Sequence, residues 1–355
     1  MDGIISPHLV SLAGLAIGLA FGFVVWRSDW CVMGAVSDIV LIGDWRRMRS
    51  WLLAIATAIL GTQALVLAGV LAAAGSGGPA SQASWIGGIV GGLAFGYGMT
   101  RTGGCISKNL VRLGGGSLRA LVVLMVVAVT ALATLTWPPL LLEWIDAADR
   151  PAVEASQADL PALLGIGASG QALLAVLIAG GLAWFCLKDR RFRASRPLLL
   201  AGLTLGLLVP LSWLAAASQA GPDGLLALAA LNFVGASMST LGFLTAASPV
   251  LSFGVALFGG TILGALAGAG ADGRLRLEGF AGAQDLRSNL GGATLMGVGG
   301  AIAGGCTVGQ GLTGVSTLGL ASVVAALAIV LGALAGVRTL EAGGLRGAFR
   351  ALAGG

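Results

Sequence analysis

Two Gly-Gly-Cys triplets lie 201 residues apart in this chain, and their residue types suit the binding of a sulfur-containing anion. They are Gly103-Gly104-Cys105 and Gly304-Gly305-Cys306, and a matching glycine, Gly96 or Gly297, precedes each cysteine by nine residues. Glycines let a backbone approach a ligand closely. A helix that begins after such a turn offers unpaired N–H groups and a partial positive charge, while a thiol is a weak donor with a polarizable sulfur. We expect neutral thiols, because a thiolate would repel an anion.

Cys31 shares part of this local pattern. An arginine lies four residues before Cys31 and before Cys105, as Arg27 and Arg101, and a Phe-Gly pair ends nine residues before each cysteine. The same 201-residue offset aligns Asn232 with Cys31 in the sequence repeat. We therefore predict a site where four hairpins approach one another, three carrying a cysteine and one carrying Asn232.

The composition places these hairpins in an integral membrane protein. The 355 residues are 57% apolar and 10% charged, with a mean hydropathy of +0.95, which leaves too little polar surface to cover a soluble globule. The stretches that lead into Gly103 and Gly304 are short and glycine-interrupted, so we expect helices that stop inside the protein. The predicted fold is an all-α polytopic membrane protein with about nine transmembrane helices plus short re-entrant helices that start at the cysteines. The candidate crossings lie near residues 9–26, 51–74, 85–99, 120–142, 172–187, 197–217, 249–269, 290–303 and 318–337.

Basic residues fall in alternate connections between these stretches, and this alternation predicts the orientation. Clusters lie around Arg47, Arg191, Arg276 and Arg346, whereas an acidic stretch around Asp146 lies in the opposite set. Cytoplasmic connections carry the excess of basic residues, so we expect the N-terminus outside and the C-terminus in the cytoplasm. The first residues lack the basic region of a cleavable signal, and we expect the first stretch to remain as a helix. The net charge of +5 reflects this topology and is no reason to expect nucleic-acid binding.

The same count of crossings predicts two halves of inverted topology. Five crossings separate the starts of the helices before Cys105 and Cys306, so these helices should run in opposite directions. We expect a first half over 1–142, a linker with one transmembrane helix over 143–196, and a second half over 197–355. Most of the 60 glycines are expected to allow close helix packing in lipid.

Charged side chains near the hairpins are weaker candidates. Arg27, Arg101 and Lys108 could attract an anion electrostatically, although basic residues at helix ends more often reach the membrane interface. Asp38 could carry a proton or pair with a nearby arginine such as Arg27.

The remaining polar and cysteine residues narrow the class of protein. Thr307 and Gln310 could bind substrate or satisfy backbone groups at the second triplet. Cys186 lacks the glycine pattern, and we interpret it as apolar filler. His8 is the only histidine, so we expect no metal cluster and no histidine general base. We also expect no catalytic residue and no cofactor.

Three motif segments resemble the YeeE/YedE family of sulfur-compound transporters. They are Phe21–Arg47, Gly96–Gly116 and Leu295–Leu312, and Arg276–Phe280 is also similar to that family. The resemblance implies uptake of thiosulfate across a bacterial inner membrane, with three cysteines handling the substrate in turn; by motif these are Cys31, Cys105 and Cys306. It also implies a soluble sulfurtransferase of the TusA type as a partner, which we expect to be a separate protein.

The residues and the resemblance together predict a transporter and not an enzyme. A sulfur oxyanion would pass along thiols and hairpin N-termini without a covalent bond, because several weak sites allow both binding and release. Two alternatives stay open. One is a permease for another sulfur or selenium species, and the other is a membrane thiol sulfurtransferase or oxidoreductase in which one cysteine attacks the substrate and another resolves the adduct.

Overall fold

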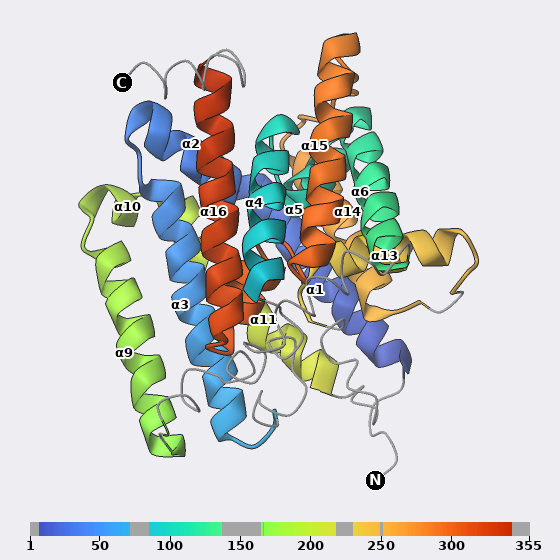
Figure 1. The fold of residues 1–355 in the computed structure, drawn as a ribbon. Helices are drawn as coiled ribbons and strands as arrows, with labels where there is room; N and C mark the ends of the chain where they lie inside the picture. Colours follow the sequence, from blue (N-terminus) through green and yellow to red (C-terminus); the bar gives the residue numbers. More distant parts are fainter. Residues whose placement is uncertain are drawn as a thin grey trace.

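Nine long helices dominate the computed structural model, which describes residues 7–71, 85–136, 165, 167–217, 230–248 and 251–342. Within these residues the fold is helical, apart from loops, turns and an isolated β-bridge between Ser117 and Glu278 (Figure 1). Each of the nine predicted stretches overlaps a long helix, and the all-α polytopic membrane fold is confirmed, although the predicted number of crossings is not. The long helices are α1 (Pro7–Ser28), α3 (Arg46–Leu67), α4 (Trp85–Arg101), α6 (Leu118–Thr136), α9 (Ala168–Leu187), α11 (Arg196–Ala217), α14 (Phe253–Ala271), α15 (Ala283–Ile302) and α16 (Leu320–Glu341).

Seven segments of the described chain are long and apolar enough to cross a membrane. One segment, His8–Ile42, joins α1 to the following short helix α2 (Val32–Ile42), and the others correspond to α3, α6, α9, α11, α14 and α16. The two remaining long helices are α4, with 17 residues, and α15, which has a polar first half and many glycines. Both lead into a Gly-Gly-Cys triplet, and both come from the stretches that the sequence marks as short and glycine-interrupted.

Glycines let the long helices pack in close pairs. A Cβ atom on Gly14, Gly18 or Gly22 of α1 would overlap the backbone of α14, and one on Gly92 or Gly96 of α4 would overlap the backbone of α16. Small residues at helix contacts permit such an approach in lipid. The interpretation of many glycines as packing residues is therefore confirmed.

Four of the five short helices in the described chain follow the predicted hairpin positions. α2, α5 (Ile106–Gly114) and α13 (Phe233–Leu244) have 11, 9 and 12 residues, and η3 (Gly309–Gly314) is a single π-helical turn. Each is far shorter than the roughly 20 residues that cross a bilayer. Each follows one of the four positions that the sequence pairs, so a short helix is present in every predicted hairpin.

α9 lies at the edge of the molecule and packs chiefly on α3 (Figure 1). Only 17% of its apolar stretch is buried, and large side chains such as Leu177 and Trp184 are exposed. This helix therefore presents a lipid-facing surface. The short helix α10 (Arg190–Ala194) follows it and lies beside the start of α3.

Candidate functional site

Cys31 forms the turn between α1 and α2. Its backbone is extended (φ −163°, ψ 131°), and its carbonyl accepts a hydrogen bond from the N–H of Ala35 at 2.9 Å, which makes Cys31 the N-cap residue of α2. The chain turns here because Asp29 adopts the left-handed conformation (φ 52°), which aspartate tolerates better than most residues. Cys31 is buried, and it lies at the positively polarised start of the helix.

Cys105 occupies the same position before α5. Gly103 has φ 71°, so the chain reverses at a place where a side chain would be strained. The Cys105 sulfur lies 3.1 Å from the Ser107 hydroxyl oxygen, and Cys105 is buried. The Asn109 side chain donates to the carbonyls of Gly104 and Cys105, each at 3.0 Å, and these bonds hold the loop in place.

Cys306 follows a turn of the same kind, in which Gly304 has φ 68°. The Gln310 side chain donates to the carbonyl of Ala303 at 2.7 Å, so Gln310 satisfies a backbone group freed at the end of α15. The N–H of Gly309 donates to the Cys306 sulfur at 3.4 Å. A thiol that accepts a hydrogen bond in this way keeps its own proton available for donation.

The helix after Cys306 differs from the prediction. We expected a short α-helix with the cysteine in its first turn, and this is wrong here: the structure has the π-helical turn η3, which begins three residues after Cys306. Glycines at 309, 311 and 314 weaken the preference for an α-helix, and π-helical turns are frequent at functional sites.

The second glycine of each triplet leaves room for a side chain of the following helix. A Cβ atom on Gly104 would lie 3.0 Å from Cγ of Lys108, and one on Gly305 would lie 3.3 Å from Cγ of Gln310. These glycines therefore let a longer side chain fold back over the loop.

Asn232 caps α13 at the position that the repeat pairs with Cys31. Its side-chain oxygen accepts a hydrogen bond from the N–H of Val234 at 3.1 Å, and its amide group donates to the carbonyl of Gly304 at 3.4 Å. A Cβ atom on Gly309 would lie 2.8 Å from the Asn232 oxygen. The fourth hairpin thus contacts the loop of Cys306.

Three of the predicted loops meet inside the protein. The thiols of Cys31 and Cys105 are neighbours and interact with each other, and the Thr307 hydroxyl lies beside the Cys105 thiol. Since Thr307 directly follows Cys306, the third cysteine loop reaches the same place. All three cysteines are buried. The structure therefore brings Cys31, Cys105 and the Cys306 loop together, and Asn232 joins them through Gly304.

The charged candidates are mostly engaged in ion pairs beside this site. Lys108 pairs with Asp29, and Arg47 also pairs with Asp29 at 2.7 Å. Asp38 pairs with Arg47 at 3.4 Å. The sequence had suggested Arg27 as its partner, and that pairing is not formed.

Arg27 and Arg101 lie at the ends of α1 and α4. Arg27 pairs with Asp272 at 2.6 Å, at the end of α14. The Arg101 carbonyl accepts a hydrogen bond from the Ser288 side chain at 3.4 Å, and its Cβ packs against Gly292 of α15. Electrostatic attraction of an anion by Arg27, Arg101 or Lys108 stays a prediction.

Cys186 lies apart from the three loop cysteines. It packs with Leu53, Phe192 and Leu198 in a small apolar cluster separate from the main one, and its thiol donates to the carbonyl of Arg49 at 3.2 Å. This environment fits the interpretation of Cys186 as filler.

Sequence reasoning named Thr307 but missed three other polar groups near the loops. Across the part of the chain that the structure describes, Nε1 of Trp30, Nε1 of Trp51, Oγ1 of Thr307 and Oγ of Ser322 are buried without a hydrogen-bond partner. Buried polar groups nearly always have one, so such donors mark places where a ligand or water binds. Trp30 could have been identified from the sequence as a candidate site residue, because it directly precedes Cys31. Trp51 could not, because only the fold brings its indole against Gly311 of η3.

The arrangement offers thiol, hydroxyl and N–H groups at and near helix starts. Such donors suit an anion that must be bound and released. Among the described residues, no group of three or more His, Cys, Asp or Glu side chains is placed to hold a metal ion.

Comparison with known proteins places the chain among transporters. The chain is 27% identical over 322 residues to the thiosulfate transporter TsuA of Escherichia coli (strain K12), a match that covers 85% of this chain and 86% of the relative. A family model described as sulphur transport matches residues 27–335, which contain all three loop cysteines. That family is the one that the motif segments resemble, and its members are transporters and not enzymes. The chain therefore belongs to the YeeE/YedE family of sulphur transport proteins.

Proposed function

We propose that this sulfur-compound transporter imports thiosulfate, and that the ion passes along Cys31, Cys105 and Cys306 and the starts of the short helices without forming a covalent bond. The observation that carries the proposal is the meeting of the Cys31 and Cys105 thiols with Thr307 in the protein interior. The similarity to a thiosulfate transporter supports the choice of substrate.

The chemistry of the donors supports a relay. Each helix start and each thiol contributes a modest attraction, and a series of modest sites lets an ion lose water at one site and leave for the next. The terminal sulfur of thiosulfate is a soft acceptor, whereas sulfate presents only strongly hydrated oxygens. Thiol donors therefore favour thiosulfate.

Two inverted halves, over 1–142 and 197–355 with a linker between them, would place the hairpins opposite one another. The contacts support this: α1 packs on α14 as α11 packs on α3, and α4 packs on α16 as α15 packs on α6. The helices before Cys105 and Cys306 are antiparallel, because Ser288 contacts Arg101 while Gly299 contacts Gly91. The fold thus has the pairing that such a repeat requires.

The expected location is a bacterial inner membrane, with the N-terminus outside and the C-terminus in the cytoplasm. The basic connections support this orientation. A separate TusA-type sulfurtransferase would then receive the imported sulfur at the cytoplasmic face, and co-purification of such a protein with the transporter tests this partner.

Uptake of labelled thiosulfate by cells without other thiosulfate importers tests the relay. Cys105→Ala and Cys306→Ala should each reduce uptake by about tenfold or more, since a hydrogen bond to a charged group contributes roughly 1.5–3 kcal/mol. Cys186→Ala, which removes a thiol outside the site, should keep normal uptake. Normal uptake by a well-folded Cys105→Ala protein would refute the relay.

Intact-protein mass spectrometry during turnover separates this proposal from a sulfurtransferase. The neighbouring Cys31 and Cys105 thiols are the pair that could attack a substrate and resolve the adduct. We expect no added mass on any cysteine. Competition by sulfate, sulfite and selenite then tests the substrate: a transporter inhibited equally by sulfate would not be a thiosulfate importer.

A further inference from the structure

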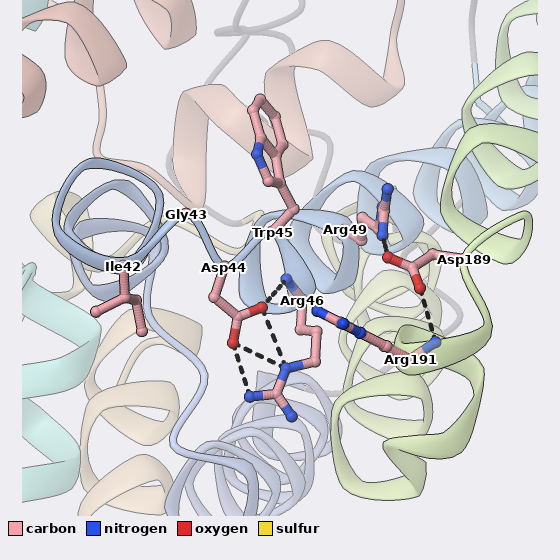
Figure 2. Close-up of a pocket in the computed structure, with 8 residues that line it drawn as sticks. All are labelled: Ile42, Gly43, Asp44, Trp45, Arg46, Arg49, Asp189 and Arg191. Atoms are coloured by element: carbon pink, nitrogen blue, oxygen red, sulfur yellow. Dashed lines mark hydrogen bonds and ion pairs between the residues drawn. The ribbon is translucent and has the colours of Figure 1, made fainter.

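A surface pocket lies where the end of α2 and the start of α3 meet the start of α10, and no residue of the cysteine loops lines it. It has a volume of about 490 Å³, and it is lined by Ile42, Gly43, Asp44, Trp45, Arg46, Arg49, Asp189 and Arg191 (Figure 2). These residues come from the connection between α2 and α3, the first turn of α3, and the start of α10. The transport proposal gives no role to this pocket.

The pocket has an uncompensated positive charge. Arg46 pairs with Asp44 at 2.7 Å, and Arg49 pairs with Asp189. Hydrogen bonds from Arg46 lower the pKa of Asp44 below its ordinary value, so this carboxylate stays ionised and neutralises Arg46. Three arginines against two aspartates leave a charge of +1.

Arg191 is the cation that supplies this surplus charge. Its backbone N–H donates to Asp189 at 2.7 Å, but its guanidinium group has no ion pair with any residue that the structure describes. Figure 2 shows this side chain extending from α10 toward Arg46. Nε of Arg49 is also buried without a hydrogen-bond partner within the described ranges. The pocket therefore holds N–H donors that could form hydrogen bonds to an oxyanion such as a phosphate group.

The neighbouring surface shows where such an anion would come from. Trp184 and Phe185, at the end of the lipid-facing helix α9, are exposed and lie under Lys188 and Arg49 in cation–π contacts of 5.0 and 5.3 Å. On the other side of the pocket Ile42 is 71% exposed. Apolar side chains beside a basic pocket, at the end of a helix that faces lipid, mark the boundary between hydrocarbon and head groups.

We propose that this pocket binds the phosphate group of an anionic phospholipid. Arg191 and Arg49 would donate to the phosphate oxygens, and the acyl chains would lie along the exposed face of α9. A lipid fits better than an acidic protein segment, because the apolar side chains adjoin the pocket on the side where α9 meets the bilayer.

Native mass spectrometry of the detergent-purified protein tests this site. Added phosphatidylglycerol should give a discrete bound state, and Arg191→Gln should weaken that binding by about tenfold, as expected for loss of a charge-assisted hydrogen bond. The matched control is Arg193→Gln, since Arg193 is an exposed arginine of the same short helix that does not line the pocket. This variant should bind the lipid like the original protein. Melting temperatures without lipid show whether the variants fold.

Other ligands distinguish the source of the phosphate. Phosphatidylcholine and inorganic phosphate should bind at least tenfold more weakly than phosphatidylglycerol. Equal binding of inorganic phosphate, or displacement of the lipid by soluble polyglutamate, would overturn the lipid assignment. Equal weakening by Arg191→Gln and Arg193→Gln would show general charge attraction and overturn the pocket itself.

Discussion

Thr307 is the residue that links the two triplets, because it follows one cysteine and contacts the other. Its hydroxyl lies beside Cys105, yet it has no hydrogen bond of ordinary geometry to any described residue. Trp30, directly before Cys31, likewise holds a buried indole N–H without a partner in the described chain. Donors left over in the interior are costly unless something binds to them. At the residue scale, we therefore expect substrate to bind at these donors in the proposed relay.

Thr307→Val tests whether the Thr307 hydroxyl binds substrate. Valine keeps the shape but removes the hydroxyl, so uptake of thiosulfate should fall by about tenfold, while stability should be unchanged or slightly raised because a buried unsatisfied group is lost. Uptake assays and melting temperatures of the purified protein measure the two effects. A variant that transports normally would exclude a role for Thr307 in substrate binding.

Thr313→Val is the matched control within the same segment. The Thr313 hydroxyl already donates to the carbonyl of Leu231 at 2.9 Å in the buried interior. Its removal should lower stability by about 1–3 kcal/mol, since the carbonyl loses its partner. We thus expect Thr307→Val to lower uptake without lowering stability, and Thr313→Val to lower stability.

At the scale of elements, glycine positions decide how closely helices approach. Gly260 of α14 faces α1, and a Cβ atom there would lie 2.5 Å from the carbonyl oxygen of Leu15. Gly259 is the preceding residue in the same helix, and a Cβ atom there would meet nothing within 4 Å.

Gly260→Ala and Gly259→Ala should therefore change stability in opposite directions. Overpacking at Gly260 should cost about 1–3 kcal/mol. Alanine at Gly259 should gain about 0.5–1 kcal/mol, because glycine loses more backbone freedom in a helix. Thermal unfolding in detergent measures both. Similar melting temperatures for the two variants would contradict the close α1–α14 contact.

The ion pair between Asp29 and Lys108 ties the turn before α2 to α5. The Lys108 side chain is 12% exposed and that of Asp29 is 58% exposed, so the two partners differ in solvation. An unpaired ammonium group costs more when it is buried.

Removing Asp29 and removing Lys108 should therefore lower the stability by different amounts. Asp29→Asn tolerates the left-handed turn but leaves Lys108 unpaired, and it should destabilise the protein by about 1–3 kcal/mol. Lys108→Met leaves a carboxylate that water and Arg47 still reach, and it should cost less. Urea or thermal unfolding of both single variants and the double variant provides the comparison. A larger loss from Lys108→Met would show that packing of the lysine stem, and not its charge, holds α5.

At the scale of the whole molecule, the basic connections predict which face meets the cytoplasm. A green fluorescent protein fused after residue 341 should fluoresce, whereas alkaline phosphatase fused within the connection 137–164 should be active outside the membrane. The reverse result would show that the protein has the opposite orientation in the membrane, so that the hairpins would be entered from the other face. That connection lies outside the described residues, so the prediction comes from charge alone.

Much of this architecture could be predicted from local signals. Apolar stretches predicted where the long helices lie, because burial in lipid demands continuous hydrophobic length, and seven segments of the described chain meet that demand. The Gly-Gly-Cys pattern gave the loops, since left-handed glycines at 103 and 304 are needed to reverse the chain. The same reasoning failed after Cys306, where glycine-rich sequence forms a π-helical turn in place of an α-helix.

The sequence by itself determined the all-α membrane class and the positions of Cys31, Cys105 and Asn232 at helix starts, because these depend on residues close together in the chain. Only the tertiary structure decided which groups meet: Thr307 beside Cys105, Trp51 against Gly311, and Arg47 as the partner of Asp38. Those contacts join residues that are distant in the sequence, and they depend on the packing of helices side by side, which hydropathy and spacing do not encode.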